Sequence, residues 1–397
     1  MLYSLAVFLS FIGVTLLYIR DIVDSHHYVN RASGNESPAK REVILLIPVY
    51  KEAEIINQTY GYFAEIAKTC DVKVIFITTE AEGSASDNAT YSLLEKLNRN
   101  KDVELKHYNG VRLSKAAQVN AVMDEYKNKT DYFAIFDADS RPDPRGIKFV
   151  LQSESQTDVF QMPSIYLPHK TNTLASQTMA VFQTRWSYCF EIPKWRKWQS
   201  WTNGPSVMYV VGHGLFIKNN IRFSESTITE DLELGYRLSA KRATMTLVPY
   251  FDTAHVPKKF TTAVIQSSRW YYGELVAPIT FWKYAPKAKT GHSAEYSVRS
   301  LIRYAQILLW MAGPLFVISG LIMSTDNPVL LMLGLTSITL YWLMHSLICY
   351  YGNASYQSLL LMPIKLVING IGPMLCFIYT LLDILKLKEF RFVKTAR

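Results

Sequence analysis

The chain has 397 residues, a formal net charge of +9 and a hydrophobic fraction of 49%. This length allows one large domain or two ordinary ones, and the hydrophobic fraction is high for a wholly soluble protein. Positively charged loops beside membrane spans and anionic lipid explain the net charge, which argues against nucleic acid as a partner. The four cysteines show no metal-ligand spacing, so we expect them to be structural.

The first apolar segment predicts a membrane anchor over residues 1–20. Leu2 to Ile19 is uncharged and would span roughly 27 Å as a helix, close to the hydrocarbon thickness of a bilayer. A signal peptide is the alternative reading. No basic residue precedes the run and no small-residue cleavage site follows it, so we expect a retained anchor.

Residues 41–260 alternate apolar strands with amphipathic stretches, which predicts a cytoplasmic α/β domain with a mainly parallel sheet flanked by helices. In such a sheet, ligands gather at the carboxyl ends of the strands. The expected elements, in chain order, are a strand over Val43–Ile47, a helix over Glu54–Thr69, a strand in "VKVIFITTE", a helix near Tyr91–Asn98, a strand over Val103–His107 and a fourth strand in "YFAIF".

The fourth strand runs into "DADSRPDP", in which Asp137 and Asp139 would project together where the strand stops. Like charges this close repel unless a cation lies between them. A plain turn is the alternative, because Asp and Pro are common turn residues. A phosphatase is a weaker alternative, since its Asp pair would follow the first strand. A dinucleotide-binding domain is excluded, because "PVYKEAE" replaces its glycine-rich turn.

The C-terminal part of the chain predicts further membrane segments. Tyr304–Met323 and Val329–Tyr350 read as a transmembrane hairpin within residues 301–350, after interfacial amphipathic helices over 261–300. Residues 358–386 are broken by Pro and Gly, so we expect a re-entrant or membrane segment there, followed by a basic tail over 387–397. Lys and Arg flank the central domain, which places it in the cytoplasm.

The motifs "IPVYKE", "LSKAAQVNAV", "DAD", "VGHGLFIKN", "TEDLELGYRL" and "QSSRW" occur in this order. Together they resemble the membrane-bound family 2 glycosyltransferases, the group that contains cellulose, chitin and hyaluronan synthases. The resemblance implies a GT-A fold, a nucleotide-sugar donor, Mg²⁺ or Mn²⁺, and inversion at the anomeric carbon. UDP is the default nucleotide.

The resemblance also implies roles for individual residues. Asp231 would be the general base and Glu230 its orienting neighbour. The alternative is that both acids only complement a helix dipole, with Thr227 and Glu230 in a capping box. The metal would be held by Asp139 and Asp137. The donor-binding residues would be Tyr50, Glu52, Glu80, Lys115, Asp137 and Arg269, and the acceptor-binding residues Gly212, His213, Gly214, Gln266 and Trp270.

Two of these assignments have competing readings. Gln266, Arg269 and Trp270 share a helix face, which also suits an interfacial membrane helix. After the second strand, many family members carry paired aspartates before Gly-Ser, whereas this chain has "TTEAEGS". Thr79, Glu80 or Glu82 would take over the role of those aspartates.

The expected function is therefore metal-dependent synthesis of a β-linked polysaccharide at the plasma (inner) membrane. Partners would be the nucleotide-sugar donor, a glycan acceptor, membrane lipid, and export partners or a second copy of the chain. One alternative is a non-processive enzyme that acts on a lipid-linked acceptor. Another is an inactive donor-binding or secretion scaffold, against which the retained Asp139 and Asp231 argue.

Overall fold

The computed structural model divides the chain into two compact units. The helical unit comprises Met1–Val29, Ile165–Lys194 and His255–Arg397, and the sheet unit comprises Asn30–Ser164 and Trp195–Ala254. The structure describes residues 1–30, 41–98, 100–110, 114–168, 173–193, 196, 214–225, 229–241, 243–257, 259–284, 301, 316–352, 354–361 and 370–378.

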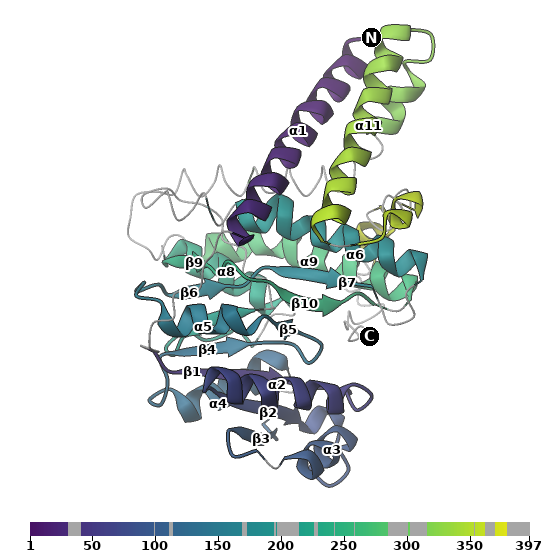
Figure 1. Cartoon of the computed structure of the whole chain (residues 1–397). Coiled ribbons are helices and arrows are strands. Elements are labelled where there is room, and N and C mark those ends of the chain that lie inside the picture. Colours follow the sequence, from purple (N-terminus) through teal and green to yellow (C-terminus); the bar gives the residue numbers. More distant parts are fainter. Residues whose placement is uncertain are drawn as a thin grey trace. The chain divides into compact units, whose positions relative to one another are not determined.

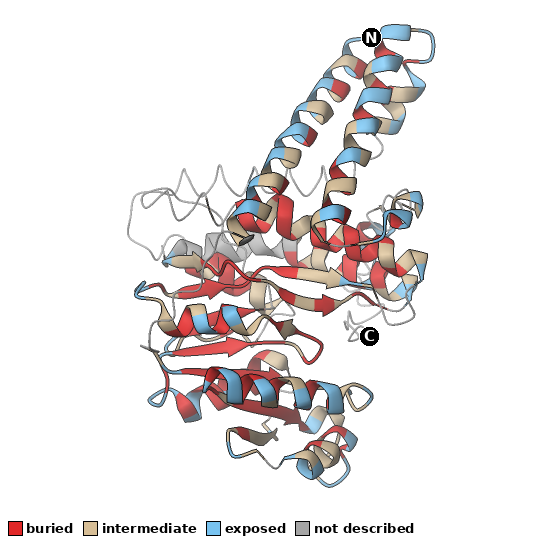
Figure 2. Ribbon diagram, in the orientation of Figure 1, coloured by how far each residue is buried: buried red, intermediate tan, exposed pale blue. Residues whose placement is uncertain are grey.

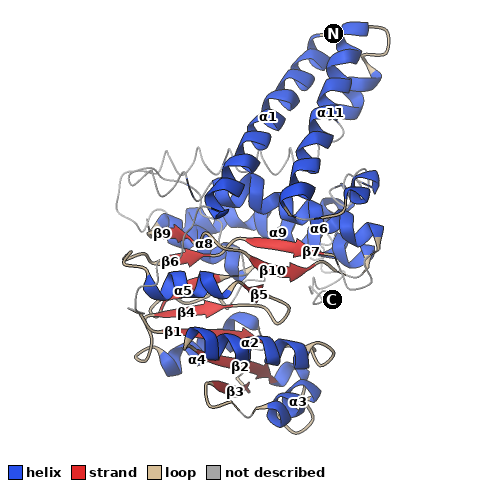
Figure 3. Ribbon diagram, in the orientation of Figure 1, coloured by secondary structure: helices blue, strands red, loops and turns tan. Residues whose placement is uncertain are grey.

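The sheet unit is built on a mixed seven-stranded sheet with strand order β3-β2-β1-β4-β8-β6-β9. Neighbours among the first four strands of this order run parallel, whereas β8 is antiparallel to both β4 and β6. Figure 1 labels these strands apart from β8, and Figure 3 colours the elements by type. The strands are β1 (Val43–Pro48), β2 (Lys73–Thr79), β3 (Val103–Tyr108), β4 (Tyr132–Ile135), β6 (Val159–Gln161), β8 (Leu215–Lys218) and β9 (Met245–Leu247).

Helices cover both faces of this sheet, and the side-chain alternation of β1 separates the two cores. From Val43 to Ile47, every second residue packs with Phe63 and Val150 in one core, and the residues between them pack with Met123 and Leu234 in the other. The helices are α2 (Ile56–Cys70), α3 (Ala89–Leu97), α4 (Lys115–Tyr126), α5 (Pro144–Gln152) and α8 (Glu230–Ala240). The first four predicted strands are thus confirmed, in order.

Two short strands pair as an antiparallel ribbon beside the turn that follows β4, within a small sheet of strand order β5-β10-β7. They are β5 (Arg141–Pro142) and β10 (Asp252–His255), with Asp252 opposite Pro142 and Thr253 opposite Arg141. The chain passes from the sheet unit to the helical unit through β7 (Ser164–Leu167). The ribbon therefore brings a segment from the end of the sheet unit next to the "DADSR" motif.

The helical unit contains two long apolar helices, α1 (Leu2–Asn30) and α11 (Pro328–Tyr351). Phe8 of α1 is fully buried and lies against Gly334, where an added Cβ would come within 3.1 Å of its ring. Figure 2 shows exposed residues along both helices. Leu9 of α1 and Met332 of α11 are among the exposed apolar side chains. The other elements are α6 (Leu174–Trp186), a π-helical turn (Ser187–Glu191), α9 (Phe260–Tyr284) and a 3₁₀ helix (Tyr356–Leu361).

Both long helices are long and apolar enough to cross a membrane, with mean hydropathies of 2.1 and 1.5 over their most apolar windows. By itself this is weak evidence, because buried core helices and signal sequences share these properties. Helix α1 is longer than the predicted 1–20 anchor. Of the predicted first C-terminal span, residues 304–315 lie outside the described part, so the number of C-terminal spans stays a prediction. Residues 387–397 also lie outside it.

An ionic cluster ties the edge strand β3 to β2 and α4. Glu104 accepts hydrogen bonds from Tyr126 at 2.7 Å, and Lys73 and Lys106 lie 2.5 and 2.9 Å from its carboxylate. Burial alone would raise the pKa of Glu104, but the hydrogen bonds from Lys73, Lys106 and Tyr126 outweigh it and lower the pKa to about 2. The ionised carboxylate therefore stabilises the folded state.

Replacing Glu104 with Gln should lower the free energy of unfolding by about 1 kcal/mol at pH 7, since solvent partly screens the pairs. The contribution is complete above the ordinary Glu pKa and is lost as the pH falls towards about 2. Thermal unfolding should therefore show a smaller difference in Tm between wild type and variant at pH 3 than at pH 7. Glu125→Gln, at the exposed end of the cluster, is the control and should show a smaller effect.

Candidate active site

Three groups of predicted site residues follow parallel strands and so meet at one edge of the sheet. Tyr50 and Glu52 follow β1, Glu80 follows β2, and the Asp pair follows β4. The strand registers keep these ends level, because Ile135 pairs with Leu46 of β1. The structure thus confirms that the "DAD" motif follows the fourth strand, at the carboxyl ends of the parallel strands.

The aspartate pair lies in a turn rather than at the end of a strand. Strand β4 ends at Ile135, and the Ser140 N–H donates to the Asp137 carbonyl at 3.0 Å, which closes a four-residue turn. The strand-like alternation expected for the pair is therefore wrong. Asp139 is 7% exposed, whereas the Asp137 side chain keeps 23% of its surface. The two carboxylates consequently have different surroundings.

Lys115 supplies a positive charge beside this turn. Ser114 caps α4 by accepting a hydrogen bond from the Ala117 N–H, which fixes Lys115 in the first helical turn. The Lys115 Nζ lies 2.6 Å from Asp137 Oδ1. Burial works to lower the pKa of Lys115, but the carboxylates of Asp137, Glu230 and Asp231 outweigh it and raise the pKa. The ammonium therefore stays charged.

Glu230 and Asp231 lie in the first turn of α8 and reach the same pocket as Lys115. Asp231 Oδ1 accepts a hydrogen bond from the Leu232 N–H at 2.8 Å. The predicted cap residue Thr227 lies outside the described residues. The pocket is lined by Lys115, Ala116, Val119, Ile135, Leu215, Phe223, Glu230 and Asp231. The structure thus brings together one cation and two acids that are 115 or more positions apart in the sequence.

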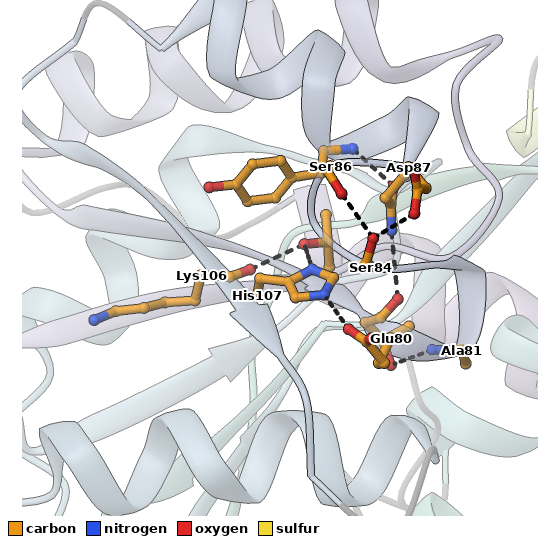
Figure 4. A network of polar contacts seen from close by, with 11 residues as sticks. Glu80, Ala81, Ser84, Ser86, Asp87, Lys106 and His107 are labelled. Atoms are coloured by element: carbon orange, nitrogen blue, oxygen red, sulfur yellow. Dashed lines mark hydrogen bonds and ion pairs between the residues drawn. The ribbon is translucent and has the colours of Figure 1, made fainter.

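The edge beyond β2 has a separate polar network, shown in Figure 4. Glu80 and His107 point toward each other, with Oε2 and Nε2 2.8 Å apart. The other ring nitrogen of His107 lies 2.9 Å from Thr78 Oγ1. The Glu80 side chain is 42% exposed. Its carboxylate is therefore held by a histidine and still open to solvent.

Glu82 is used differently from Glu80. One of its oxygens accepts the Lys51 N–H at 2.5 Å and the other accepts the Thr90 hydroxyl at 2.6 Å. Lys51 has a φ of 56°, a left-handed conformation that is costly for a residue other than glycine. Glu82 therefore holds the turn after β1, while Thr79 caps the Ala81 N–H. Of the three residues that sequence reasoning left open, Glu80 has the exposed carboxylate.

The predicted acceptor residues are divided between the two units. Gly212 and His213 lie outside the described residues. Gly214 has a φ of 61°, and an added Cβ would come within 2.8 Å of the Met162 carbonyl oxygen, so a structural constraint alone explains this glycine. Gln266 and Trp270 belong to α9 in the helical unit, together with Arg269. Gln266 is buried and accepts a hydrogen bond from Gln183 at 2.9 Å.

No role was predicted from the sequence for Asn120, which lies in the motif "LSKAAQVNAV". Its side-chain amide accepts from the Phe223 N–H and donates to the Phe223 carbonyl, both at 3.0 Å. It also donates to Glu225 at 3.1 Å. Asn120 therefore fixes the segment that leads to α8, which carries Glu230 and Asp231. The position of this polar residue in the middle of an amphipathic helix was the sequence signal that could have indicated such a role.

The model of the family described as "Glycosyl transferase family group 2" matches residues 132–381, more than half of the chain. The chain belongs to this family. It is therefore a glycosyltransferase, as the sequence predicted. No curated protein matches its sequence.

Two solved structures are similar to this chain. A mannosyltransferase from Pyrobaculum calidifontis, in complex with GDP-Man and Mn²⁺, is similar over 94% of this chain and 98% of that one, with a TM-score of 0.52 and 14% identity. TarS 1–349 from S. aureus, in complex with UDP, is similar over 79% of this chain and 93% of the TarS chain, with a TM-score of 0.39 and 12% identity. The mixed sheet flanked by helices is consistent with the predicted GT-A fold.

The site of this glycosyltransferase fits a hard divalent cation that is held partly by substrate. Within the described ranges, no three His, Cys, Asp or Glu side chains form a preformed metal cage. Mg²⁺ is commonly bound by one or two carboxylates together with phosphates and water. Asp139 and Asp137 would supply those carboxylates, and Lys115 already neutralises part of the charge of Asp137. Bound there, the cation would stabilise negative charge on a leaving group.

Replacing Lys115 with Met should reduce glycosyl transfer by roughly 10- to 100-fold, because a charge-assisted contact in the pocket is lost. Lys115→Arg should retain more activity, since it keeps the charge. Initial rates with a donor that the wild type accepts would measure both. The control is Lys96→Met, which removes an exposed charge from α3. Full activity of Lys115→Met would remove this lysine from the site.

Proposed function

We propose that this glycosyltransferase moves a sugar from a nucleotide-sugar donor to an acceptor hydroxyl with inversion at the anomeric carbon. The observation that carries the proposal is the pocket in which Lys115 meets Glu230 and Asp231 while its ammonium contacts Asp137. One end of this arrangement suits an anionic leaving group, and the other end suits removal of a proton.

The reaction is a single displacement. The acceptor oxygen forms a bond to the anomeric carbon as the bond to the diphosphate oxygen breaks, so the configuration inverts. Asp231 accepts the hydroxyl proton, which requires hydrogen-bond reach of that hydroxyl. Glu230 orients Asp231 from the same helical turn. Lys115 offsets the negative charge that develops on the diphosphate.

The other assigned residues would bind the two substrates. Tyr50, Glu52 and Glu80 follow neighbouring strands, where they would contact the nucleotide, with UDP as the default. Arg269 would contact the diphosphate, and Gln266, Trp270 and residues 212–214 would border the acceptor. The Pyrobaculum complex with GDP-Man and Mn²⁺ supports a nucleotide-sugar donor and a divalent cation.

We place the enzyme in the plasma (inner) membrane with its sheet unit in the cytoplasm. The two long apolar helices and their exposed leucine and methionine side chains support membrane insertion. A β-linked polysaccharide is the proposed product, as in the membrane-bound synthases. The second candidate is single transfer to a lipid-linked acceptor, which the same helices favour because they would hold the lipid.

Incubation of the purified chain with a panel of nucleotide sugars and divalent metals, followed by measurement of nucleotide diphosphate release, tests the reaction. Size analysis of the product from labelled donor separates the two candidates. A ladder of long chains indicates a synthase, and a single lipid-soluble product indicates single transfer. No release with any donor and metal would contradict the proposal.

The two carboxylate sites should fail differently when neutralised. Asp139→Asn should lose metal-dependent donor binding together with turnover, since an amide is a poor ligand for a hard cation. Asp231→Asn should bind donor and metal almost normally while kcat falls by about 100- to 10,000-fold, because only proton removal is lost. Calorimetry of donor binding and transfer rates would measure both effects.

The matched control is Asp143→Asn, which neutralises a carboxylate four residues beyond Asp139 that pairs with Arg145. This variant should keep its metal dependence. Transfer at the wild-type rate by Asp231→Asn would refute the assigned base. Unchanged metal dependence in Asp139→Asn would make the "DAD" motif a turn and nothing more.

The proposed topology puts the C-terminal tail in the cytoplasm, in keeping with its positive charge. A cysteine introduced by Thr395→Cys should resist an impermeant thiol reagent in intact cells and react after the cells are opened. Cysteine introduced at Thr325, in the polar link before α11, should react in intact cells. Ready labelling at position 395 in intact cells would place the tail outside.

A further inference from the structure

The turn that carries Asp137 and Asp139 is held by an arginine that immediately follows it. Arg141 Nη1 donates to the carbonyl oxygens of Ala138 and Ser140, at 3.0 and 2.7 Å. These two carbonyls flank Asp139 on either side. A planar guanidinium can make such contacts in a fixed geometry, which a flexible ammonium cannot reproduce.

Helix α2 supports the guanidinium on its other side. Arg141 Nη2 donates to Thr59 Oγ1 at 3.1 Å, and the same hydroxyl donates to the Ala138 carbonyl at 2.7 Å. The guanidinium also lies over the ring of Tyr62, with 5.2 Å between Cζ and the ring centroid. Thr59 is fully buried. Arg141 is therefore immobilised by a neighbouring helix, and the turn is fixed to that helix through it.

A buried carboxyl group anchors the end of the turn. Ser140 Oγ donates to Asp252 Oδ2 at 2.9 Å, and both residues are completely inaccessible to solvent. Asp252 belongs to β10, whose position is set by pairing with β5 and by a hydrogen bond from the Asp252 N–H to the Pro163 carbonyl. Within the described part of the chain, no donor reaches the buried Asp252 Oδ1.

Burial of this carboxyl group is costly, and a buried acid so close to an acidic motif calls for an explanation. Burial and the nearby charge of Asp137 raise the pKa of Asp252 to about 7, although hydrogen bonds from Ser140 and the Arg141 N–H work against the shift. A small apolar side chain could be buried at this position at a lower cost in free energy, but it could not accept the hydrogen bond from the Ser140 hydroxyl.

We propose that Arg141 and Asp252 are positioning residues that hold the Asp137–Ser140 turn in the geometry required for cation binding. Arg141 fixes the backbone on both sides of Asp139, and Asp252 fixes Ser140. The turn is thereby shaped before the cation arrives, so less ordering is needed on binding. This inference rests on the proposed function, in which Asp139 and Asp137 hold a divalent cation.

Calorimetric titration of the full chain with Mn²⁺ in the presence of UDP, whose phosphates would supply part of the coordination, tests the arginine. Arg141→Lys keeps the charge and loses the planar fork, so its Mn²⁺ affinity should fall about 10- to 100-fold, as for other residues that orient metal ligands. At saturating Mn²⁺, the kcat for transfer should recover toward wild type. Arg145→Lys is the matched control, because Arg145 pairs with Asp143 on the surface, and it should bind Mn²⁺ normally.

The carboxyl group is tested by Asp252→Ala and Asp252→Asn. The alanine variant should bind Mn²⁺ weakly, whereas the asparagine keeps an acceptor for Ser140 and should restore most of the affinity. Ser140→Ala removes the same hydrogen bond with the carboxyl group in place, and it replaces Asp252→Ala in the test if that variant does not fold. Thermal unfolding of every variant separates lost binding from lost structure.

The outcomes distinguish this inference from the function on which it rests. Wild-type Mn²⁺ affinity in Arg141→Lys would overturn the role of the guanidinium fork. Wild-type affinity in both Asp252→Ala and Ser140→Ala would overturn the role of Asp252. A wild-type chain that releases nucleotide diphosphate without any metal would refute the proposed cation site, and this inference with it.

Discussion

Electrostatic repulsion among acidic side chains at one edge of the sheet is the constraint on which the rest of the site depends. Asp137 and Asp139 follow β4, Glu230 and Asp231 begin α8, and Asp252 is buried in the adjacent ribbon. Repulsion among these carboxylates would destabilise the site unless a positive charge and a fixed backbone opposed it. Lys115 supplies the charge, and the arrangement of the surrounding elements can be understood from its position.

Hydrogen bonds of its own helix fix the surroundings of Lys115. Ser114 caps the helix that carries the lysine, and Asn120 on the same helix clasps the backbone of Phe223. Helix α4 therefore positions both the cation and the segment that leads to the acids of α8. A single helix thus sets the spacing between Lys115 and the acids of α8, to which the proposed function assigns the stabilisation of the leaving group and the removal of a proton.

The sequence predicted the parts of this structure that depend on local patterns. The strands β1 to β4 are short runs of buried apolar residues, and their alternation with amphipathic stretches was enough to place the "DAD" motif at the ligand edge. Contacts between distant residues were not predictable. Asp252 meets Ser140 across 112 positions and Asn120 meets Phe223 across 103, and neither pairing leaves a periodic signal. The end of β4 at Ile135 was not predicted either. The apolar run continues through Phe136 into the turn, and no glycine marks the point where the turn begins.

The role of Glu82 has a consequence for exchanging parts between related enzymes. This carboxylate belongs to a 3₁₀ helix after β2 (Glu80–Glu82), which it joins to the turn after β1 and to the start of α3. It also holds Lys51 in a left-handed conformation. A chimaera that imported only one of these segments would separate the carboxylate from the backbone it restrains, and the turn would relax toward an ordinary conformation. The three segments therefore form one structural module that would have to be exchanged as a unit.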